Sequence, residues 1–172
     1  GWLVETDRGA WRADSVAIAT GHSQATRIPG CAEDLAKDIA QVATSAYRNP
    51  AQLPEGGVLV VGASASGVQL ADEILRSGRE VTIAVGRHTR VPRSYRGRDI
   101  MYWLDRTGAL QRPLSDMPSA ADAKREPSLQ LVADDLGRSL DLANLAEQGA
   151  RIAGRLVAID GYRVRFQNDL SQ

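Results

Sequence analysis

A short segment rich in glycine and serine has the residue types and the spacing to bind a phosphate group. Residues 62–67 read Gly-Ala-Ser-Ala-Ser-Gly, which is the G-x-(G/S)-x-x-G spacing of a phosphate-binding turn. In such a turn Gly62 permits a tight bend, Ser64 lets the backbone approach a pyrophosphate, and Gly67 lets a helix pack closely. A helix that begins here would add N–H groups and the positive end of its dipole. We therefore predict that this turn binds phosphate; the alternative is a purely structural turn. The predicted binding residues are Gly62, Ala63, Ser64, Ala65, Ser66 and Gly67.

The residues on both sides of this turn have the patterns of a strand–helix–strand unit. Residues 57–61 form a short β-branched run, which is typical of a strand buried on both faces. Apolar residues then recur at helical spacing from Val68 to Leu75, and Gly78 can end the helix. Residues 80–85 are a second apolar strand. This βαβ pattern predicts an α/β fold of the Rossmann type, a mostly parallel open sheet with helices on both faces.

The end of the second strand indicates which dinucleotide the turn would bind. Units that bind NAD place Asp or Glu there to hold the ribose 2′-hydroxyl. Residues 85–90 read Val-Gly-Arg-His-Thr-Arg and contain no carboxylate. Arg87 and Arg90 can instead hold a 2′-phosphate through charge-assisted hydrogen bonds, which contribute roughly 1.5–3 kcal/mol each. We therefore predict a preference for NADPH, and the alternative is that both arginines are solvated loop residues.

The composition narrows the classes of function. The chain has 172 residues, of which 43% are hydrophobic and 24% are charged, and this suits a packed domain. Its 21 basic and 21 acidic residues give a formal net charge of zero, which argues against nucleic-acid and membrane-surface partners. Nine arginines between residues 76 and 112 keep a nucleic-acid-binding domain as a minor alternative.

The content of cysteine, histidine and apolar residues excludes further classes of function. Cys31 is the single cysteine, so the chain has no internal disulfide and no Cys-x-x-Cys redox pair. Two histidines leave too few ligands for a histidine-rich metal centre. The apolar runs are far shorter than the roughly 20 residues of a membrane span, and we expect no signal peptide. We expect a cytoplasmic protein with neither a metal nor a membrane partner.

The N-terminal third has strand and linker patterns. Residues 1–9 and 11–21 alternate like the two strands of a hairpin. Pro50 and Pro54 mark a linker that leads into the βαβ unit. The chain starts and stops within strand-like patterns, from which we expect a piece of a longer polypeptide.

The C-terminal part predicts one short helix and one hairpin. Asp141 and Gly149 are suitable caps for a helix between them. Residues 151–160 and 162–166 are strand-like and flank Gly161, which predicts a closing hairpin.

Six segments of the chain also form a combined pattern. They are Ala19-Thr-Gly21, Pro29-Gly30, Tyr47-Arg-Asn-Pro50, the glycine-rich residues 57–67, Gly86-Arg-His-Thr-Arg90 and residues 141–161. Together they resemble the flavin-containing monooxygenase-like oxidoreductases. These flavoproteins have two dinucleotide-binding domains and are related to the pyridine nucleotide-disulphide reductases. The likeness covers nearly the whole chain.

The resemblance implies an order of domains and a set of cofactors. Residues 1–50 would be the C-terminal strip of an FAD domain with a linker, and residues 51–172 an NADPH-binding Rossmann-like domain with a small antiparallel β-meander. The nicotinamide of NADPH would deliver hydride to the flavin of FAD. The implied cofactor-binding residues are Ala19, Thr20 and Gly21 beside the flavin, and the glycine-rich turn with Arg87, His88 and Arg90 beside NADPH.

The resemblance also implies a function. This chain would be the NADPH-binding portion of an oxidoreductase or monooxygenase that oxidises a small organic substrate together with the remainder of the FAD domain. The monooxygenase fingerprint Phe-x-Gly-x-x-x-His-x-x-x-(Tyr/Phe/Trp) falls on Lys37, Ile39, Ala43 and Tyr47, and only Tyr47 matches it. The alternatives are a non-catalytic NAD(P)-binding module and a flavin reductase-type oxidoreductase without oxygenation. The sequence predicts neither catalytic residues nor an oligomeric state.

Overall fold

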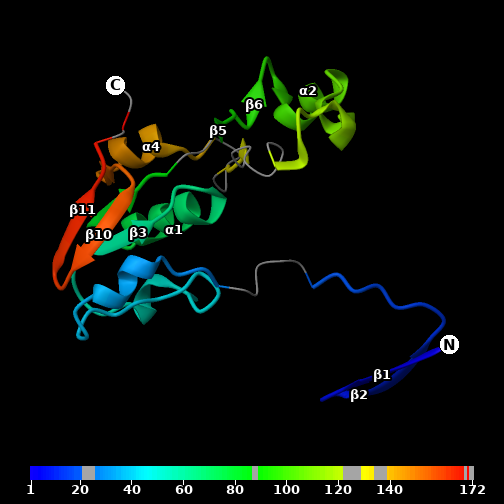
Figure 1. The fold of residues 1–172 in the computed structure, drawn as a ribbon, viewed down its shortest axis with the longest axis horizontal. Coiled ribbons are helices and arrows are strands. Elements are labelled where there is room, and N and C mark those ends of the chain that lie inside the picture. Colours follow the sequence, from blue (N-terminus) through cyan, green and yellow to red (C-terminus); the bar gives the residue numbers. More distant parts are fainter. Residues whose placement is uncertain (21–25, 87–88, 122–128, 134–138, 169, 171–172) are drawn as a thin grey trace.

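A three-stranded parallel sheet organises the fold. Its strands are β3 (Val58–Val61), β4 (Val81–Ala84) and β9 (Arg151–Ala153), in the order β3-β4-β9 (Figure 1). The α/β fold of the Rossmann type that the sequence predicts is confirmed by this sheet and its helices. The structure is a computed structural model that describes residues 1–20, 26–86, 89–121, 129–133, 139–168 and 170.

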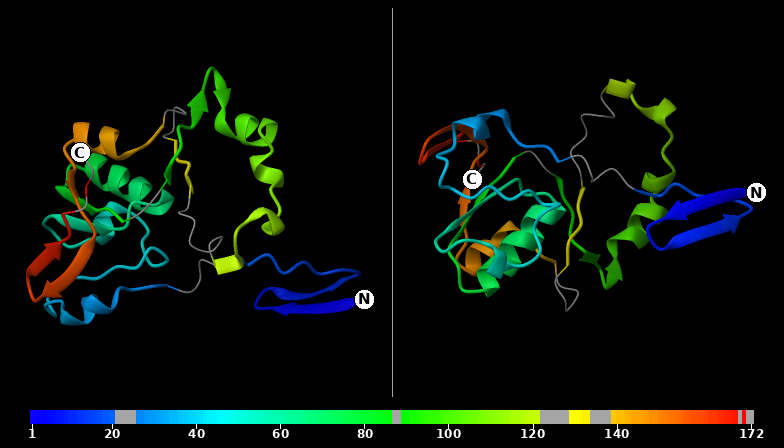
Figure 2. Two further views of the ribbon diagram at one scale, coloured as in Figure 1. Left: turned by 45° about the horizontal axis from the view of Figure 1, so that its top comes forward. Right: turned by 90° about the horizontal axis from the view of Figure 1, so that it is seen from below.

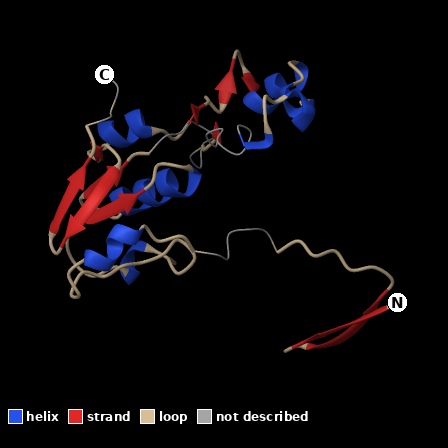
Figure 3. Ribbon diagram, viewed as in Figure 1, coloured by secondary structure: helices blue, strands red, loops and turns tan. Residues whose placement is uncertain are grey.

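Two helices pack against this sheet. Helix α1 (Ala65–Arg76) connects β3 to β4, and helix α4 (Leu142–Glu147) precedes β9 (Figure 3). The two helices contact each other as well as the strands, so they cover the same face of the sheet. The helices expected on both faces are therefore found, within the described residues, on one.

The position of each strand in the sheet decides how deeply it is buried. We expected the first strand to be buried on both faces, and this was wrong: Val58, Leu59 and Val60 are half-buried and Val61 is 48% exposed. The cause is that β3 lies at the edge of the described sheet, whereas β4 lies in its middle. Ile83 of β4 is accordingly fully buried.

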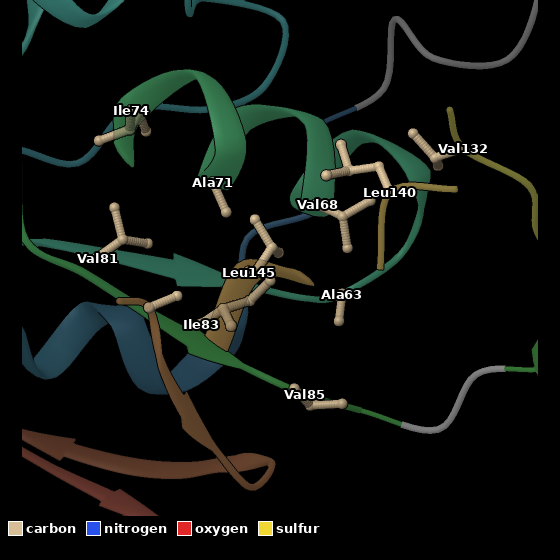
Figure 4. Close-up of a cluster of buried hydrophobic side chains, with 11 residues drawn as sticks. Ala63, Val68, Ala71, Ile74, Val81, Ile83, Val85, Val132, Leu140 and Leu145 are labelled. Carbon is tan, nitrogen blue, oxygen red and sulfur yellow. The ribbon is translucent and has the colours of Figure 1, made fainter. Parts of the chain in front are cut away.

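The hydrophobic core lies between the sheet and the two helices (Figure 4). The largest fully buried side chains are Val68 of α1, Ile83 of β4 and Leu145 of α4, so the sheet and each of the two helices contribute one of them. Burying such a side chain stabilises the fold by about 1.5–3 kcal/mol. The other members of the cluster are Ala63, Ala71, Ile74, Val81, Val85, Val132, Leu140 and Ala150.

The turn between β3 and α1 depends on two glycines. Gly62 has a backbone φ of +104°, which residues with a side chain rarely adopt. A Cβ atom on Gly67 would lie 1.9 Å from the carbonyl oxygen of Gly62 and 2.9 Å from its carbonyl carbon. The first turn of α1 lies directly against the end of β3 because Gly67 has no side chain. This is the close helix–strand packing that the sequence predicted for Gly67.

Arg79 holds the linker against the amino end of β4. Its guanidinium donates to the carbonyl oxygens of Leu53 at 3.0 Å and Gly56 at 2.7 Å, and also to that of Pro54. These bonds tie the segment before β3 to the residues before β4. Beside Arg79 is a surface hollow, lined by Glu55 and Glu80 among others. Because Arg79 and Glu80 precede β4, this hollow lies at the amino edge of the sheet, opposite the glycine-rich turn.

The C-terminal residues form a third parallel strand and a separate hairpin. We expected residues 151–160 to form one strand of the closing hairpin, and the structure corrects this. Strand β9 joins the parallel sheet beside β4, and only β10 (Leu156–Asp160) pairs with β11 (Arg163–Phe166) in antiparallel fashion. Gly154 and Arg155 separate the two strands and let the chain pass from one sheet to the other.

The N-terminal hairpin is shorter than expected. Strand β1 (Trp2–Thr6) pairs with β2 (Gly9–Ala13), so the second strand stops well before Gly21. Residues 14–20 continue without pairing to any described strand, and Ile18 is 89% exposed. An alternating sequence without a neighbouring strand has no partner for its backbone groups, which is why the predicted strand ends early. The hairpin lies apart from the parallel sheet in each view (Figures 1 and 2).

Residues 34–38 are held against the C-terminal hairpin. The Gly161 N–H donates to the Asp34 carbonyl oxygen at 2.9 Å, and Leu35 forms a parallel bridge with Gly161. The Tyr162 hydroxyl lies 2.7 and 2.8 Å from the two carboxylate oxygens of Asp38, and this hydrogen bond raises the pKa of Tyr162. These contacts join the segment that follows the N-terminal hairpin to the turn between β10 and β11. Two short 3₁₀ turns, η1 (Gly30–Asp34) and η2 (Pro50–Gln52), lie in the same part of the chain.

An arm is inserted between β4 and α4 and projects from the sheet (Figure 2). At its base β5 (Thr89–Arg90) pairs in parallel with β8 (Leu129–Gln130). Ile100 is buried, and the Trp103 indole N–H donates to the Tyr95 carbonyl oxygen at 2.8 Å. The remaining elements of the arm are β6 (Ser94–Tyr95), β7 (Arg98–Asp99), α2 (Ile100–Arg106), η3 (Ala109–Gln111) and η4 (Leu114–Asp116).

Replacing Gly67 by alanine should destabilise the protein strongly. The added methyl group collides with the Gly62 backbone, which cannot move without breaking the turn, so we expect a loss of about 2 kcal/mol or more. Urea unfolding of Gly67→Ala and wild type measures this loss. Gly86→Ala is the matched control, because a Cβ atom there meets no atom within 4 Å and φ is not positive. Equal stability of Gly67→Ala and Gly86→Ala would contradict the steric argument.

Helix α4 depends on its first cap. The Asp141 carboxylate accepts a hydrogen bond from the Asn144 N–H at 3.0 Å, as the sequence predicted, and Gly149 follows the helix with φ of +103°. We expect Asp141→Ala to cost about 1 kcal/mol in the free energy of unfolding, because the half-buried Asn144 N–H loses its acceptor. Asp141→Asn retains an acceptor at the same place and should keep most of the stability. An alanine variant as stable as wild type in urea would show that the cap contributes nothing.

Candidate dinucleotide-binding site

The glycine-rich turn lies at the edge where the three parallel strands end. The Gly62 N–H donates to the Ala84 carbonyl oxygen at 2.9 Å, and the Val85 N–H donates to the Ala153 carbonyl oxygen at 2.9 Å. These two bonds continue the sheet by one residue beyond β3 and β4. The turn and the residues that follow β4 and β9 are therefore side by side. In open α/β sheets this carboxyl edge is where ligands bind.

The first turn of α1 presents backbone donors at this edge. Ser64 is the extended residue before the helix, and its carbonyl oxygen accepts the first helical bond, from the Val68 N–H at 3.1 Å. The N–H groups of Ala65, Ser66 and Gly67 precede that bond, so the helix itself does not use them. The first turn contains no acidic residue that would compete with a bound anion. The positive end of the helix dipole adds to the attraction.

The serine hydroxyls add to these backbone donors. The Ser64 side chain makes no capping bond to the helix, and both Ser64 and Ser66 are exposed. Ala63, by contrast, is 4% exposed and belongs to the core, so its part in binding is limited to its backbone. The turn therefore combines backbone N–H groups, two hydroxyls and a surface without large side chains, which suits a pyrophosphate.

The end of β4 is open beside this turn. A Cβ atom on Gly86 would have no atom within 4 Å, apart from its chain neighbours. Its φ is not in the positive range, so neither the backbone nor the packing of the described residues requires glycine there. This open space lies next to the Gly62 turn, where the ribose of a bound dinucleotide would come after the pyrophosphate.

The structure brings together one part of the predicted site and leaves the other parts apart. Gly62–Gly67 form the turn at the carboxyl edge, whereas Ala19 and Thr20 lie in the exposed segment 14–20 that follows the N-terminal hairpin. Arg90 is placed only as a residue of β5, beyond the end of β4. Gly21, Arg87 and His88 lie outside the described residues.

Sequence reasoning missed one pair of residues at this edge. Gly154 and Arg155 follow β9 directly, in a connection that we had assigned to the interior of a long strand. Gly154 was the available signal, because a glycine within a strand-like run marks a break or a close approach.

Several of the arginines between residues 76 and 112, here called the basic stretch, have structural partners. Arg76 pairs with the buried Asp72 at 2.5 Å, and Arg93 pairs with Asp99 at 2.5 Å. In the arm, two more arginines lie over tyrosine rings, Arg96 at 5.3 Å from the Tyr95 centroid and Arg98 at 4.4 Å from the Tyr102 centroid. Arg79 likewise has structural partners, in the linker. Two cation–π pairs are an ordinary number for the part of the chain that the structure describes.

Other kinds of site find no support in the described part of the chain. Within it, no three side chains of His, Cys, Asp or Glu gather in a way that could hold a metal ion. Each helix within the same ranges is too short or too polar to cross a bilayer. Cys31 is half-buried and its thiol is free.

Comparison with known proteins relates this site to a family. Residues 1–108 match the model of the pyridine nucleotide-disulphide oxidoreductase family. The chain is 44% identical over 108 residues to an uncharacterized CzcO-like oxidoreductase of Geobacillus kaustophilus, and 33% identical over 109 residues to the uncharacterized oxidoreductase CzcO of Bacillus subtilis. These alignments cover 62% and 63% of this chain but only 31% and 32% of the relatives.

The family match includes the features that the structure shows to be linked. It spans the N-terminal hairpin, the glycine-rich turn, α1, β4 and the first part of the arm. The family implies the use of a flavin and a pyridine nucleotide, in agreement with the resemblance found in the sequence. Since the match covers more than half of its residues, the chain belongs to the pyridine nucleotide-disulphide oxidoreductase family.

Proposed function

We propose that this chain is the NADPH-binding portion of a flavin-dependent oxidoreductase that passes hydride from NADPH to FAD and oxidises a small organic substrate. The observation that supports this most is the contact between Gly67 and the Gly62 carbonyl, which sets the start of α1 against the end of β3. That arrangement aims unused N–H groups at the carboxyl edge of a parallel sheet, where a pyrophosphate would bind.

The residues of the turn would bind and orient the dinucleotide. The N–H groups of Ala65, Ser66 and Gly67 and the hydroxyls of Ser64 and Ser66 would donate to the pyrophosphate oxygens. When bound, NADPH supplies the hydride and FAD accepts it. The chain contributes positioning to this transfer, in keeping with proteins whose cofactors carry the reaction.

The adenosine end would lie along the residues that follow β4. Gly86 leaves room for the ribose. Arg87 follows it directly, and Arg90 comes three residues after Arg87, with His88 between them. No carboxylate occurs from Val85 to Arg90, so nothing there would repel a 2′-phosphate. This supports NADPH rather than NADH as the nucleotide.

The FAD part of the proposal depends on residues beyond those that build the turn. Ala19, Thr20 and Gly21 would lie by the flavin, and residues 1–50 would belong to the FAD domain, with residues 51–172 forming the NADPH domain. The described residues contain one strand–turn–helix unit of the dinucleotide type. Since the alignments reach about a third of the relatives' length, the rest of an FAD domain would be the partner of residues 1–20.

A second candidate function is a flavin reductase-type oxidoreductase that does not insert oxygen. Lys37, Ile39 and Ala43 replace the Phe, Gly and His of the monooxygenase fingerprint. Tyr47, the remaining match, packs against the hydrophobic core beside Glu73 of α1. Burial raises the pKa of Tyr47, and the Glu73 carboxylate raises it further, so the phenol stays protonated. Its position favours a structural role over one in oxygen chemistry, and the same observation is compatible with a non-catalytic NAD(P)-binding module.

Replacing Arg87 should weaken the binding of NADPH but not that of NADH. We expect Arg87→Ala to weaken NADPH binding by roughly ten- to a hundred-fold while NADH binding changes little, because one charge-assisted hydrogen bond to the 2′-phosphate is lost. Calorimetric titration of both nucleotides measures the change. Arg98→Ala is the control, since Arg98 belongs to the same basic stretch but lies over Tyr102. Equal losses for NADPH and NADH would remove the 2′-phosphate assignment, and salt-sensitive binding of DNA or RNA without binding of either nucleotide would overturn the proposed function.

A further inference from the structure

A short segment from the first part of the chain lies on the turn of the C-terminal hairpin. Residues 34–38, here called the strap, contact the turn between β10 and β11 at Gly161. The Gly161 N–H donates to the Asp34 carbonyl oxygen at 2.9 Å, and the Gly161 carbonyl oxygen accepts from the Ala36 N–H at 3.2 Å. Both backbone groups of one glycine therefore bind the strap, although the two segments are far apart in the sequence.

These backbone bonds lie near the surface. Leu35 and Ala36 are only half-buried, and Lys37 and Asp38 are exposed. A contact that buries little apolar surface, with backbone hydrogen bonds close to water, opens more readily than the core does. The side chains of the strap and of the turn therefore determine how firmly the contact is closed.

The Tyr162 side chain adds a bond to a charged group of the strap. Its hydroxyl lies 2.7 and 2.8 Å from the two carboxylate oxygens of Asp38. Asp38 belongs to a turn in which the Ile39 N–H donates to the Ala36 carbonyl oxygen at 3.0 Å, so its position depends on that of the strap. A hydrogen bond to a carboxylate is stronger than one between neutral groups. Tyr162 follows Gly161 directly, so one turn of the hairpin makes both the backbone and the side-chain contacts.

The hydroxyl proton makes this side-chain contact attractive. Without that proton, a phenolate would face the Asp38 carboxylate with no donor between them, and the two like charges would repel. The hydrogen bond to Asp38, then burial, then the charge of Asp38 raise the pKa of Tyr162, so the phenol is protonated at neutral pH. The other charged residues of the strap, of η1 and of the hairpin strands are Glu33, Asp34, Lys37, Asp160, Arg163 and Arg165.

We propose that Tyr162 and Asp38 form a latch that keeps the strap closed on the hairpin while Tyr162 is protonated, and that a negative charge on the Tyr162 oxygen opens it. In the division of the chain proposed above, the strap belongs to the FAD part and the hairpin to the NADPH domain. The latch would then fix one part to the other. This last consequence rests on the proposed function, whereas the latch itself does not.

The single cysteine of the chain is a probe for the latch. Cys31 is half-buried in η1, which ends within the strap and contacts β10, so opening of the strap makes its thiol more accessible. The rate at which the thiol of the full chain reacts with a disulfide reagent reports this opening. Each rate is divided by the rate for the same chain unfolded in urea at the same pH, because ionisation of the thiol alone changes the reaction.

Replacing Tyr162 tests the latch at neutral pH. Tyr162→Phe removes the hydroxyl and keeps the ring, and we expect the normalised rate to rise about threefold, which is typical of one exposed contact with a charged group. Tyr102→Phe is the matched control, since Tyr102 is also exposed and its ring lies against Trp103. The control should react like wild type. An unchanged rate in Tyr162→Phe, or an equal rise in both variants, would overturn the latch.

Raising the pH tests the role of charge. A raised pKa means that the contribution of Tyr162 is present below its ordinary pKa of about 10 and is lost as the pH passes the raised value. The normalised rate of wild type should therefore rise about threefold as the phenolate absorbance of Tyr162 appears, whereas Tyr162→Phe should show no further rise. An equal alkaline rise in wild type and in Tyr162→Phe would overturn the opening by charge.

Variants of Asp38 test the same contact from the strap. Asp38→Ala removes the acceptor and should raise the normalised rate at neutral pH as Tyr162→Phe does. Asp38→Asn keeps an acceptor without the charge, so it should react like wild type at neutral pH and rise less in alkali. If Tyr162→Phe lowers the free energy of unfolding, this difference between the two Asp38 variants is still required, and equal rates would overturn the latch. These measurements use no nucleotide, so a failure of NADPH to bind leaves their outcome unchanged.

Discussion

The contact between Gly67 and the carbonyl group of Gly62 is the constraint on which the rest of the site depends. With a Cβ atom only 1.9 Å from that oxygen, any other residue at position 67 would push α1 away from β3. The helix would then no longer begin at the carboxyl edge, and its N–H groups would point elsewhere. Val68 and Ala71, on the inner face of the same helix, would lose their positions in the core. One missing side chain thus links the packing of the domain to its capacity to bind an anion.

The glycine-rich turn and the elements around it could be predicted from the sequence because each has a local physical cause. The apolar runs before Gly62 and after Gly78 predict strands, the spacing from Val68 predicts a helix, and Asp141 predicts a helix start. All of these depend on a few neighbouring residues, and all are found in the structure. The family resemblance rests largely on the same segments, and the match over residues 1–108 confirms it.

The errors concern properties that depend on distant partners. Alternation in residues 151–160 is the same whether a strand joins a parallel sheet or a hairpin, so the sequence did not show that β9 would pair with β4. Val61 has the same side chain at an edge as in the middle of a sheet, and only the sheet order decides its exposure. The segment before Thr20 alternates like a strand but has no strand to pair with among the described residues. In each case the missing information is which other segment lies alongside.

The arginines show why charge counts alone are a weak guide to partners. Arg79 donates hydrogen bonds to three backbone carbonyls, and Arg76 pairs with a buried aspartate on its own helix. Both residues stabilise the fold, and the Asp72 carboxylate offsets the positive charge of Arg76. The sequence stretch that contains them is basic, but its arginines have different roles. Where each arginine lies in the fold indicates its role better than the number of arginines does.

The contacts of residues 34–38 with the C-terminal hairpin bear on how this protein should be shortened for experiments. Asp34, Leu35 and Asp38 come early in the chain, yet their partners are Gly161 and Tyr162 near its end. A recombinant version that began after residue 50 would retain the nucleotide turn but leave the tip of the hairpin bare, with backbone groups of Gly161 turned to water. A version that began near residue 30 would keep residues 34–38 together with the hairpin that they contact. It would be the better starting point for crystals.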